Sequence, residues 1–151
     1  MTRRLVWRRL DAPGMEIAHV ESLDSAAGTQ IGADYELRWR LDGLRLALEV
    51  VGGRSTTVEL DDADFFDVFA SPFFNSLPVL RDGLLLGGPA REYTMRFVRL
   101  PSLEVVPSLQ RYEPLGSSKV RYSSGTFTAE IAFDDDGFVT TYEGFLERVA
   151  A

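Results

Sequence analysis

The chain has 151 residues, 45% of them hydrophobic and 11% aromatic, which is enough for one globular domain with a sizeable core. A net charge of −7 argues against a nucleic-acid-binding protein, because phosphates are neutralised by a basic surface. The absence of cysteine excludes disulfides, thiolate nucleophiles and cysteine-based metal sites, and the single histidine excludes a multi-histidine cluster.

The N-terminal stretch "MTRRLVWRRLDAPG" is basic but carries no apolar core of signal-peptide length. No run of the chain approaches the ~18 apolar residues that a membrane-spanning helix needs. We therefore expect a cytoplasmic protein without a transmembrane segment. The oligomeric state stays open.

A period of two dominates residues 35–59 and predicts three antiparallel strands. "YELRWRLDG" and "LRLALEVV" each place apolar side chains on one face and charged side chains on the other. Asp42-Gly43 lies between them and is a strong hairpin signal, and Gly52-Gly53 turns the chain into the β-rich run "RSTTVEL".

Residues 61–70, "DDADFFDVFA", are the only serious helix candidate. Aspartates are enriched at the start, as a helix N-terminus prefers, and Phe65, Phe66 and Phe69 would share one face. We expect at most one short helix, here.

The stretch that follows, "SPFFNSLPVL" (residues 71–80), is apolar and contains two prolines. Pro72 and Pro78 argue against an ordinary helix or a central strand. We expect a rigid corner that joins the two halves of the fold. Asn75 would hydrogen-bond local backbone groups that the prolines leave without ladder partners.

The C-terminal half returns to strand patterns. "EYTMRFVRL", "TFTAEIAF" and "FVTTYEGF" alternate apolar and polar residues, and "DDDG" (residues 134–137) forms a turn before the last of them. Strands about ten residues apart predict an all-β sandwich, barrel or roll with minor α content, as a single domain over residues 1–151.

Tests for metal and catalytic motifs give little. The aspartates of "DDDG" are consecutive and do not match the alternating ligands of a calcium loop. His19 could act as a general base beside Glu16 or Glu21, although a lone histidine on a strand is more often structural. We expect no metal and no cofactor.

Three stretches together resemble a known family. They are "SPFFNSLPV", "VRLPSLEVVPSLQRYEPL" and "VRYSSGTFTAEIAFDDDGFVTTYEGFLERV", at residues 71–79, 98–115 and 120–149. In order and spacing they resemble the bacterial family named putative glycolipid-binding, with looser agreement at Trp7, Glu16 and "LRWRLD". Departures from the family pattern are Phe74 and Ser76, where threonines are usual, and Leu80-Arg81, where paired arginines are usual.

The resemblance implies an all-β spiral roll, a strongly curved antiparallel sheet around an apolar interior. It also implies that a lipid or glycolipid is bound on the concave face. The candidate ligand-binding residues are Trp39, Phe73, Asn75, Arg81, Gln110, Arg111, Tyr112 and Tyr122, with no catalytic residue assigned.

Two other functions stay open. One is a small hydrolase or isomerase, in which Gln110, Arg111, Tyr112 and Tyr122 orient a substrate for an acid such as Glu16 or Glu104. It requires a deep polar pocket and a carboxyl group with a raised pKa. The other is an interaction module without a small-molecule ligand, which requires a filled interior and a large exposed apolar patch.

Overall fold

The computed structural model describes residues 2–149. It contains thirteen strands, one α-helix and one 3-10 turn. In chain order these are β1 (Arg3–Arg9), β2 (Gly14–Ser22), β3 (Ser25–Gly32), β4 (Glu36–Asp42), β5 (Arg45–Val50), β6 (Ser55–Glu59), β7 (Phe65–Val68), α1 (Phe73–Arg81), η1 (Leu84–Leu86), β8 (Arg91–Val98), β9 (Val105–Gly116), β10 (Lys119–Ser124), β11 (Phe127–Phe133), β12 (Val139–Tyr142) and β13 (Leu146–Val149).

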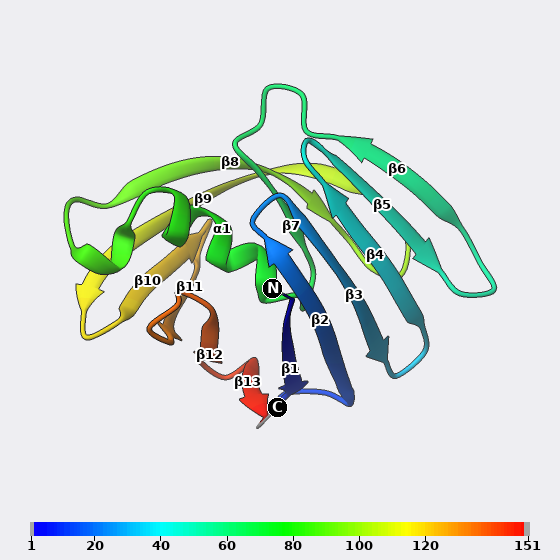
Figure 1. The fold of residues 1–151 in the computed structure, drawn as a ribbon, viewed down its shortest axis with the longest axis horizontal. Helices are drawn as coiled ribbons and strands as arrows, with labels where there is room; N and C mark the ends of the chain where they lie inside the picture. The colour runs from blue at the N-terminus through cyan, green and yellow to red at the C-terminus, as the bar shows by residue number, and fades with distance from the viewer. Residues whose placement is uncertain (1, 150–151) are drawn as a thin grey trace.

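All thirteen strands form one sheet, in the order β6-β5-β4-β3-β2-β1-β13-β12-β11-β10-β9-β8-β7. The strands from β1 to β6 and those from β8 to β13 form two antiparallel meanders, which are joined where β1 pairs with β13. The strand β7 adds to the far end and pairs with β8 in parallel. The sheet is strongly curved around α1 and does not close on itself, so the expected all-β roll is confirmed (Figure 1).

The three-stranded meander predicted over residues 35–59 is confirmed as β4, β5 and β6. The inward-facing residues of β4 are Leu37, Trp39 and Leu41, as the period of two predicts. The hairpin also forms at the predicted place, with Asp42 paired to Arg45 across the turn.

The prediction of a helix over residues 61–70 is wrong in position. Phe65–Val68 form the strand β7, because β8 supplies a partner along its whole length. The helix is instead α1, Phe73–Arg81, within the stretch where prolines argued against one. Pro72 stands at the N-cap, where no backbone donor is required, although Pro78 lies inside the helix.

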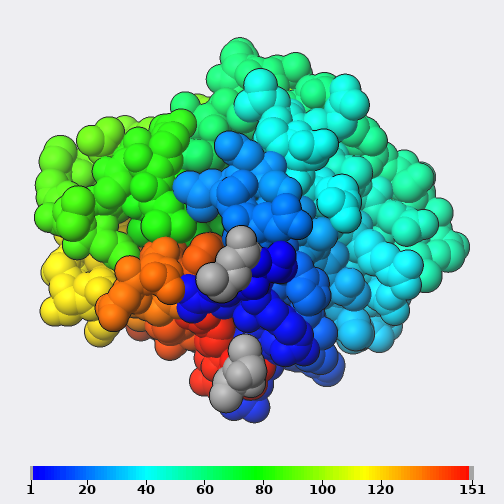
Figure 2. Space-filling model, viewed as in Figure 1, coloured from blue at the N-terminus to red at the C-terminus, as the bar shows by residue number. Residues whose placement is uncertain are grey.

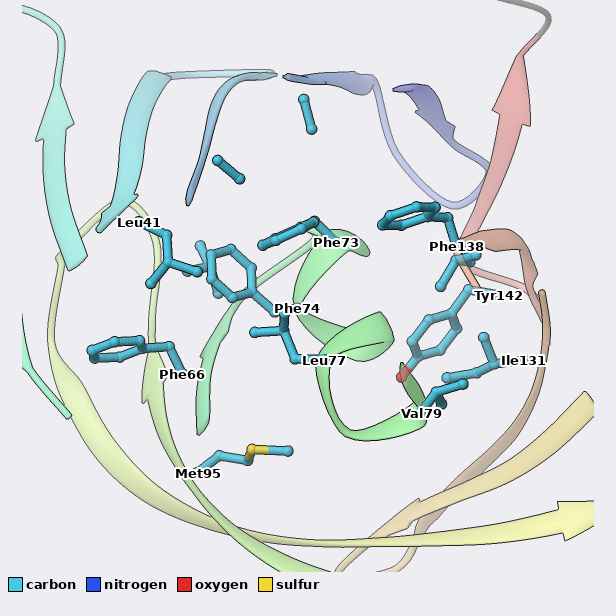
Figure 3. Packing of buried hydrophobic residues seen from close by; sticks show 14 of the residues in the cluster. Leu41, Phe66, Phe73, Phe74, Leu77, Val79, Met95, Ile131, Phe138 and Tyr142 are labelled. Carbon is cyan, nitrogen blue, oxygen red and sulfur yellow. The ribbon is translucent and has the colours of Figure 1, made fainter. Parts of the chain in front are cut away.

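The hydrophobic pattern of residues 73–81 does not indicate a helix, because α1 is enclosed on nearly every side. All seven residues from Phe73 to Val79 are buried, so the helix lacks the polar face that marks an amphipathic segment. The residues expected to form a corner between two halves therefore form a plug inside the curved sheet. Figure 3 shows Phe73, Phe74 and Leu77 pointing from α1 into the core.

The interior is packed from both meanders. Core side chains from the N-terminal half, such as Leu41, and from the C-terminal half, such as Met95 and Ile131, surround the helix (Figure 3). In the space-filling view the α1 segment meets the segment around β12 and the N-terminal strands (Figure 2). The concave face is thus filled by the protein's own helix.

Candidate functional site

Four of the predicted ligand-binding residues belong to the packed core, and two of them, Trp39 and Phe73, pack against each other. The rings of Trp39 and Phe73 stack with centroids 5.5 Å apart, and Phe74 lies 4.9 Å from Trp39. Trp39 and Phe73 are both buried. Their contacts are with α1 and its surroundings, and the candidate site lies at the margin of the core.

A pocket of about 360 Å³ lies between the end of β7, the start of α1 and the loop after β12. We call it the Asp67 pocket. Its volume falls at the small end of the ~300–1,000 Å³ range of small-molecule sites. Aromatic rings form much of its wall, and they are Phe69, Phe97, Tyr122, Phe127, Tyr142 and Phe145.

A hydrogen-bonded chain of polar side chains runs from this pocket to α1. The Gln110 amide donates to Asp67 Oδ2 at 2.8 Å, and the Tyr112 hydroxyl donates to Gln110 Oε1 at 3.4 Å. Asn75 Nδ2 in turn donates to the Tyr112 hydroxyl at 3.1 Å. Asn75 therefore bonds a distant side chain, not the local backbone groups expected from the sequence.

The carboxyl group of Asp67 is the main source of charge inside the pocket. Its residue is 8% exposed, and burial raises its pKa to about 6, against the opposing effect of the Gln110 hydrogen bond. Burial also raises the pKa of Tyr112, Tyr122 and Tyr142, and the negative charge of Asp67 adds to each shift. Three tyrosines thus lie within the electrostatic reach of one buried acid.

A second buried carboxyl group, that of Glu16, fixes the wall beside the pocket. It accepts hydrogen bonds from the Ser71 hydroxyl, from Gln30 Nε2 at 3.3 Å and from Trp39 Nε1 at 3.4 Å. Burial raises its pKa to about 7. Gln30 also donates to the Phe69 carbonyl at 2.8 Å, so two strands of the first meander hold the residues that lead into α1.

The connection from β7 to α1 passes through a rarely populated backbone conformation. Ala70 has φ of 58°, in the left-handed region that costs a residue with a Cβ about 1–2 kcal/mol. The residues on either side of Ala70 hold this turn in place, because Phe69 accepts a hydrogen bond from Gln30 and Ser71 donates one to Glu16. The geometry of the pocket wall therefore depends on Glu16 and Gln30.

The remaining sequence candidates lie elsewhere. Arg81 sits over the Phe65 ring at 4.3 Å and pairs with Asp82, beside a separate hollow of about 530 Å³. Arg111 points outward, with 44% of its side chain exposed, and pairs with Glu113 at 3.6 Å. Asn75, Gln110, Tyr112 and Tyr122 are the four that the fold brings together.

Of the acids considered for catalysis, only Glu16 lies near the pocket. Glu104 is exposed and pairs with Arg99 at 3.0 Å. His19 is exposed on the outer face of β2, opposite to Glu16, because the two side chains alternate across the strand. No His–Glu16 pair forms.

Sequence reasoning missed Asp67 and left Tyr142 out of the candidate list. Asp67 lies in residues 61–70, where the sequence predicts a helix. The preference of a helix N-terminus for acids explains the aspartates at the start of that segment and gives Asp67 no separate role. One signal was present: a single charged residue interrupts the apolar run "FFDVF". A buried acid of this kind is uncommon without a partner or a role.

Two structural features are absent from residues 2–149. No group of three or more His, Asp or Glu side chains in that range could hold a metal ion. None of the helices there is long and apolar enough to cross a membrane.

A protein-family model matches most of the chain. The model of the family described as "Putative glycolipid-binding" matches residues 24–148. This chain belongs to that family. The match begins after Trp7 and Glu16. Of the acids and tyrosines that line the Asp67 pocket, it includes all but Asp11.

A solved structure resembles this chain in its fold. The crystal structure of a DUF1089 family protein from Pseudomonas aeruginosa resembles it with a TM-score of 0.76, over 90% of this chain and 92% of that chain. Because the two sequences are 24% identical, the likeness shows the fold alone. No curated protein matches the chain.

Proposed function

We propose that this protein binds the sugar-bearing headgroup of a glycolipid or a similar amphiphile in the Asp67 pocket, without converting it. The family name points to this ligand class. One structural observation supports the proposal most: a partly enclosed pocket combines aromatic walls with a buried, hydrogen-bonded acid. We place the site there, and not across the concave face, because α1 fills that face.

The lining suits the two sides of a sugar ring. Aromatic faces pack against its C–H groups, while carboxylate, amide and phenol groups bond its hydroxyls. Asp67, Asn75 and Tyr122 offer such polar groups at the pocket surface. The orientation of Asp67 and Asn75 is fixed in advance by the hydrogen-bonded chain through Gln110 and Tyr112, which lowers the entropic cost of binding.

The alkyl part of such a ligand would lie outside the pocket. Phe127 lines the pocket and is also 51% exposed, so it forms an apolar rim. A chain that leaves the pocket across Phe127 would cover that ring.

The test compares two amphiphiles by isothermal titration calorimetry below their micelle concentrations. Octyl glucoside carries a sugar, and an octyl chain on a short oligo(ethylene glycol) head does not. We expect measurable binding of the glucoside only, weakened about tenfold by Tyr122→Phe or Asp67→Asn. Arg111→Ala, on the outer face, is the matched control and should leave binding unchanged.

Absence of binding for octyl glucoside and for other octyl glycosides would contradict the proposal. So would equal binding of both amphiphiles, because the headgroup would then play no part. An unchanged affinity in both pocket variants would place any binding outside the Asp67 pocket.

Acid–base catalysis in the same pocket is the second candidate. The observation that favours it is the raised pKa of Asp67, about 6, since a general acid or base works best near the operating pH. Hydrolysis of chromogenic glycosides and esters by wild-type protein, abolished by Asp67→Asn, would replace the binding function with this one.

A further inference from the structure

The charged side chains that line the Asp67 pocket are all acidic, and Arg9, which lies against two of its rings, is bound to Asp11. The side chains that line it include Asp11, Asp67 and Glu143, and no Lys, Arg or His. A carboxylate, phosphate or sulfate group placed in the pocket would meet repulsion from these acids. The charge pattern therefore disfavours an anionic headgroup.

Two of the three acids already have partners. Arg9 binds Asp11 through two hydrogen bonds, of 2.8 and 3.1 Å. The Glu143 carboxylate accepts the backbone N–H of Glu130 at 3.0 Å and lies on the exposed side. Asp67 is the one that stays buried inside the pocket.

No ion pair satisfies Asp67 within the part of the chain that the structure describes. Its contacts are a neutral amide, that of Gln110, and the backbone of Val68. A buried carboxylate without a cation is costly, and native proteins usually pair such a group. A ligand that brings a positive charge to Asp67 would remove this cost.

The aromatic walls favour a cation as well. The face of an aromatic ring is electronegative and attracts ammonium and guanidinium groups. This protein already uses two of these rings in that way, because the Arg9 guanidinium lies 4.7 Å from the Phe145 centroid and 5.1 Å from that of Phe69. A pocket with aromatic sides and one buried acid is therefore suited to an ammonium group.

We propose that the ligand group seated against Asp67 is an ammonium cation, so that the preferred headgroup is an amino sugar and not a neutral or phosphorylated one. This inference rests on the proposed function, since it names the headgroup class for the same pocket. The ammonium group donates to Asp67 and lies beside the rings of Tyr122 and Tyr142. No bond is made or broken.

The test uses three octyl glycosides that differ at one position: glucoside, 2-amino-2-deoxyglucoside and its N-acetyl form. The N-acetyl compound keeps the nitrogen and loses the charge. By calorimetry at about pH 7 we expect the amino compound to bind about tenfold more tightly than the other two. Asp67→Asn should remove this preference.

A second measurement needs no pocket variant and covers the case in which Asp67→Asn fails to fold. The preference of wild-type protein for the amino compound should shrink between about pH 7 and about pH 5, as Asp67 becomes protonated. The ligand gains charge over this range, so the loss must come from the protein. Because Glu16 also titrates here, the same titration in Glu16→Gln should still show the loss.

The outcomes separate the two proposals. Equal or weaker binding of the amino compound, with the neutral glucoside bound, overturns the cation proposal and leaves the proposed function standing. Absence of binding for all three overturns both. A preference for the amino compound that survives in folded Asp67→Asn, or that persists at about pH 5, also overturns the assignment to Asp67.

Discussion

Glu16 and Ser71 are 55 positions apart in the chain, and the Ser71 hydroxyl donates a hydrogen bond to the Glu16 carboxylate in the interior. Glu16 is completely buried on β2, and Ser71 precedes the helix α1. The bond thus ties the first meander to the beginning of the helix that fills the roll. It also holds one wall of the Asp67 pocket, which Ser71 lines.

Glu16→Gln should reduce the pH dependence of stability. Burial raises the pKa of Glu16 from 4.5 to about 7, so folding favours its protonated form. Its contribution is fully present below about pH 4.5 and is lost as the pH rises through about 7. The loss is on the order of 3 kcal/mol in the free energy of unfolding.

Urea unfolding of both proteins at about pH 5 and about pH 8 measures this. The glutamine can donate its N–H to the Ser71 hydroxyl, and its oxygen can accept from Gln30 and Trp39, so the hydrogen bonds are kept. We expect the stability of Glu16→Gln relative to wild type to increase from about pH 5 to about pH 8. A stability difference that is independent of pH would show that Glu16 is not the titrating group.

Asn75→Ala should lower the free energy of unfolding by about 1–3 kcal/mol, because it leaves the buried Tyr112 hydroxyl without its amide donor. Tyr112→Phe removes the other partner, and a double-mutant cycle gives the coupling between them. Chemical denaturation measures all four proteins. Normal stability of Asn75→Ala with lost glycoside binding would instead make Asn75 primarily a ligand-binding residue.

Gly28→Ala should destabilise the fold by about 1–3 kcal/mol or more. Gly28 on β3 pairs with Trp39 on β4, and the Trp39 ring lies over it. A Cβ at this position would come within 2.4 Å of the ring, which also donates to Glu16. Displacement of the Trp39 ring would therefore disturb both the core packing and the hydrogen bond to Glu16.

Gly53→Ala is the matched control for this substitution. The nearest atom to a Cβ at Gly53 is 3.4 Å away, and the residue has no left-handed φ. We expect its melting temperature to stay close to that of wild type. Equal melting temperatures for Gly28→Ala and wild type would mean that Trp39 can move without cost.

Asp134→Ala should cost about 2–4 kcal/mol, because this carboxylate joins three parts of the sheet. It accepts from Arg3 at 2.7 Å and Arg148 at 2.6 Å, and from the backbone N–H groups of Asp136 and Phe138. Its neighbour Asp135 is exposed, so Asp135→Ala in the same turn is the control. Similar unfolding curves for the two variants would contradict this role.

The same carboxyl group should contribute to acid unfolding. Burial raises the pKa of Asp134, but the hydrogen bond from Arg148 and its other partners outweigh this effect and bring the pKa below 3.8. Its stabilisation is therefore present above about pH 3.8 and is lost as the pH falls further. We therefore expect the difference in the free energy of unfolding between Asp134→Ala and wild type to become smaller at the lowest pH. Acid titrations followed by circular dichroism measure this difference.

The alternating strands were predictable from the sequence because their signal is local. In β4, Leu37, Trp39 and Leu41 must share a face, whatever lies beyond the neighbouring strands. The hairpin at Asp42-Gly43 likewise depends on a few adjacent residues. The motifs around Asn75, Gln110 and Tyr122 identified the family, and the fold places these three residues around one network and pocket.

The tertiary structure alone determines the secondary structure of residues 61–81 and the position of the candidate site. The strand β7 exists because β8, remote in sequence, supplies its hydrogen bonds, and α1 exists because the curved sheet buries it on nearly every side. Helical periodicity is visible only when one face meets water, so an enclosed helix with Pro72 and Pro78 gives no such pattern. Asp67 is a candidate site residue for the same reason. Its burial, its raised pKa and its lack of a cationic partner within residues 2–149 depend on its tertiary surroundings and not on the neighbouring sequence.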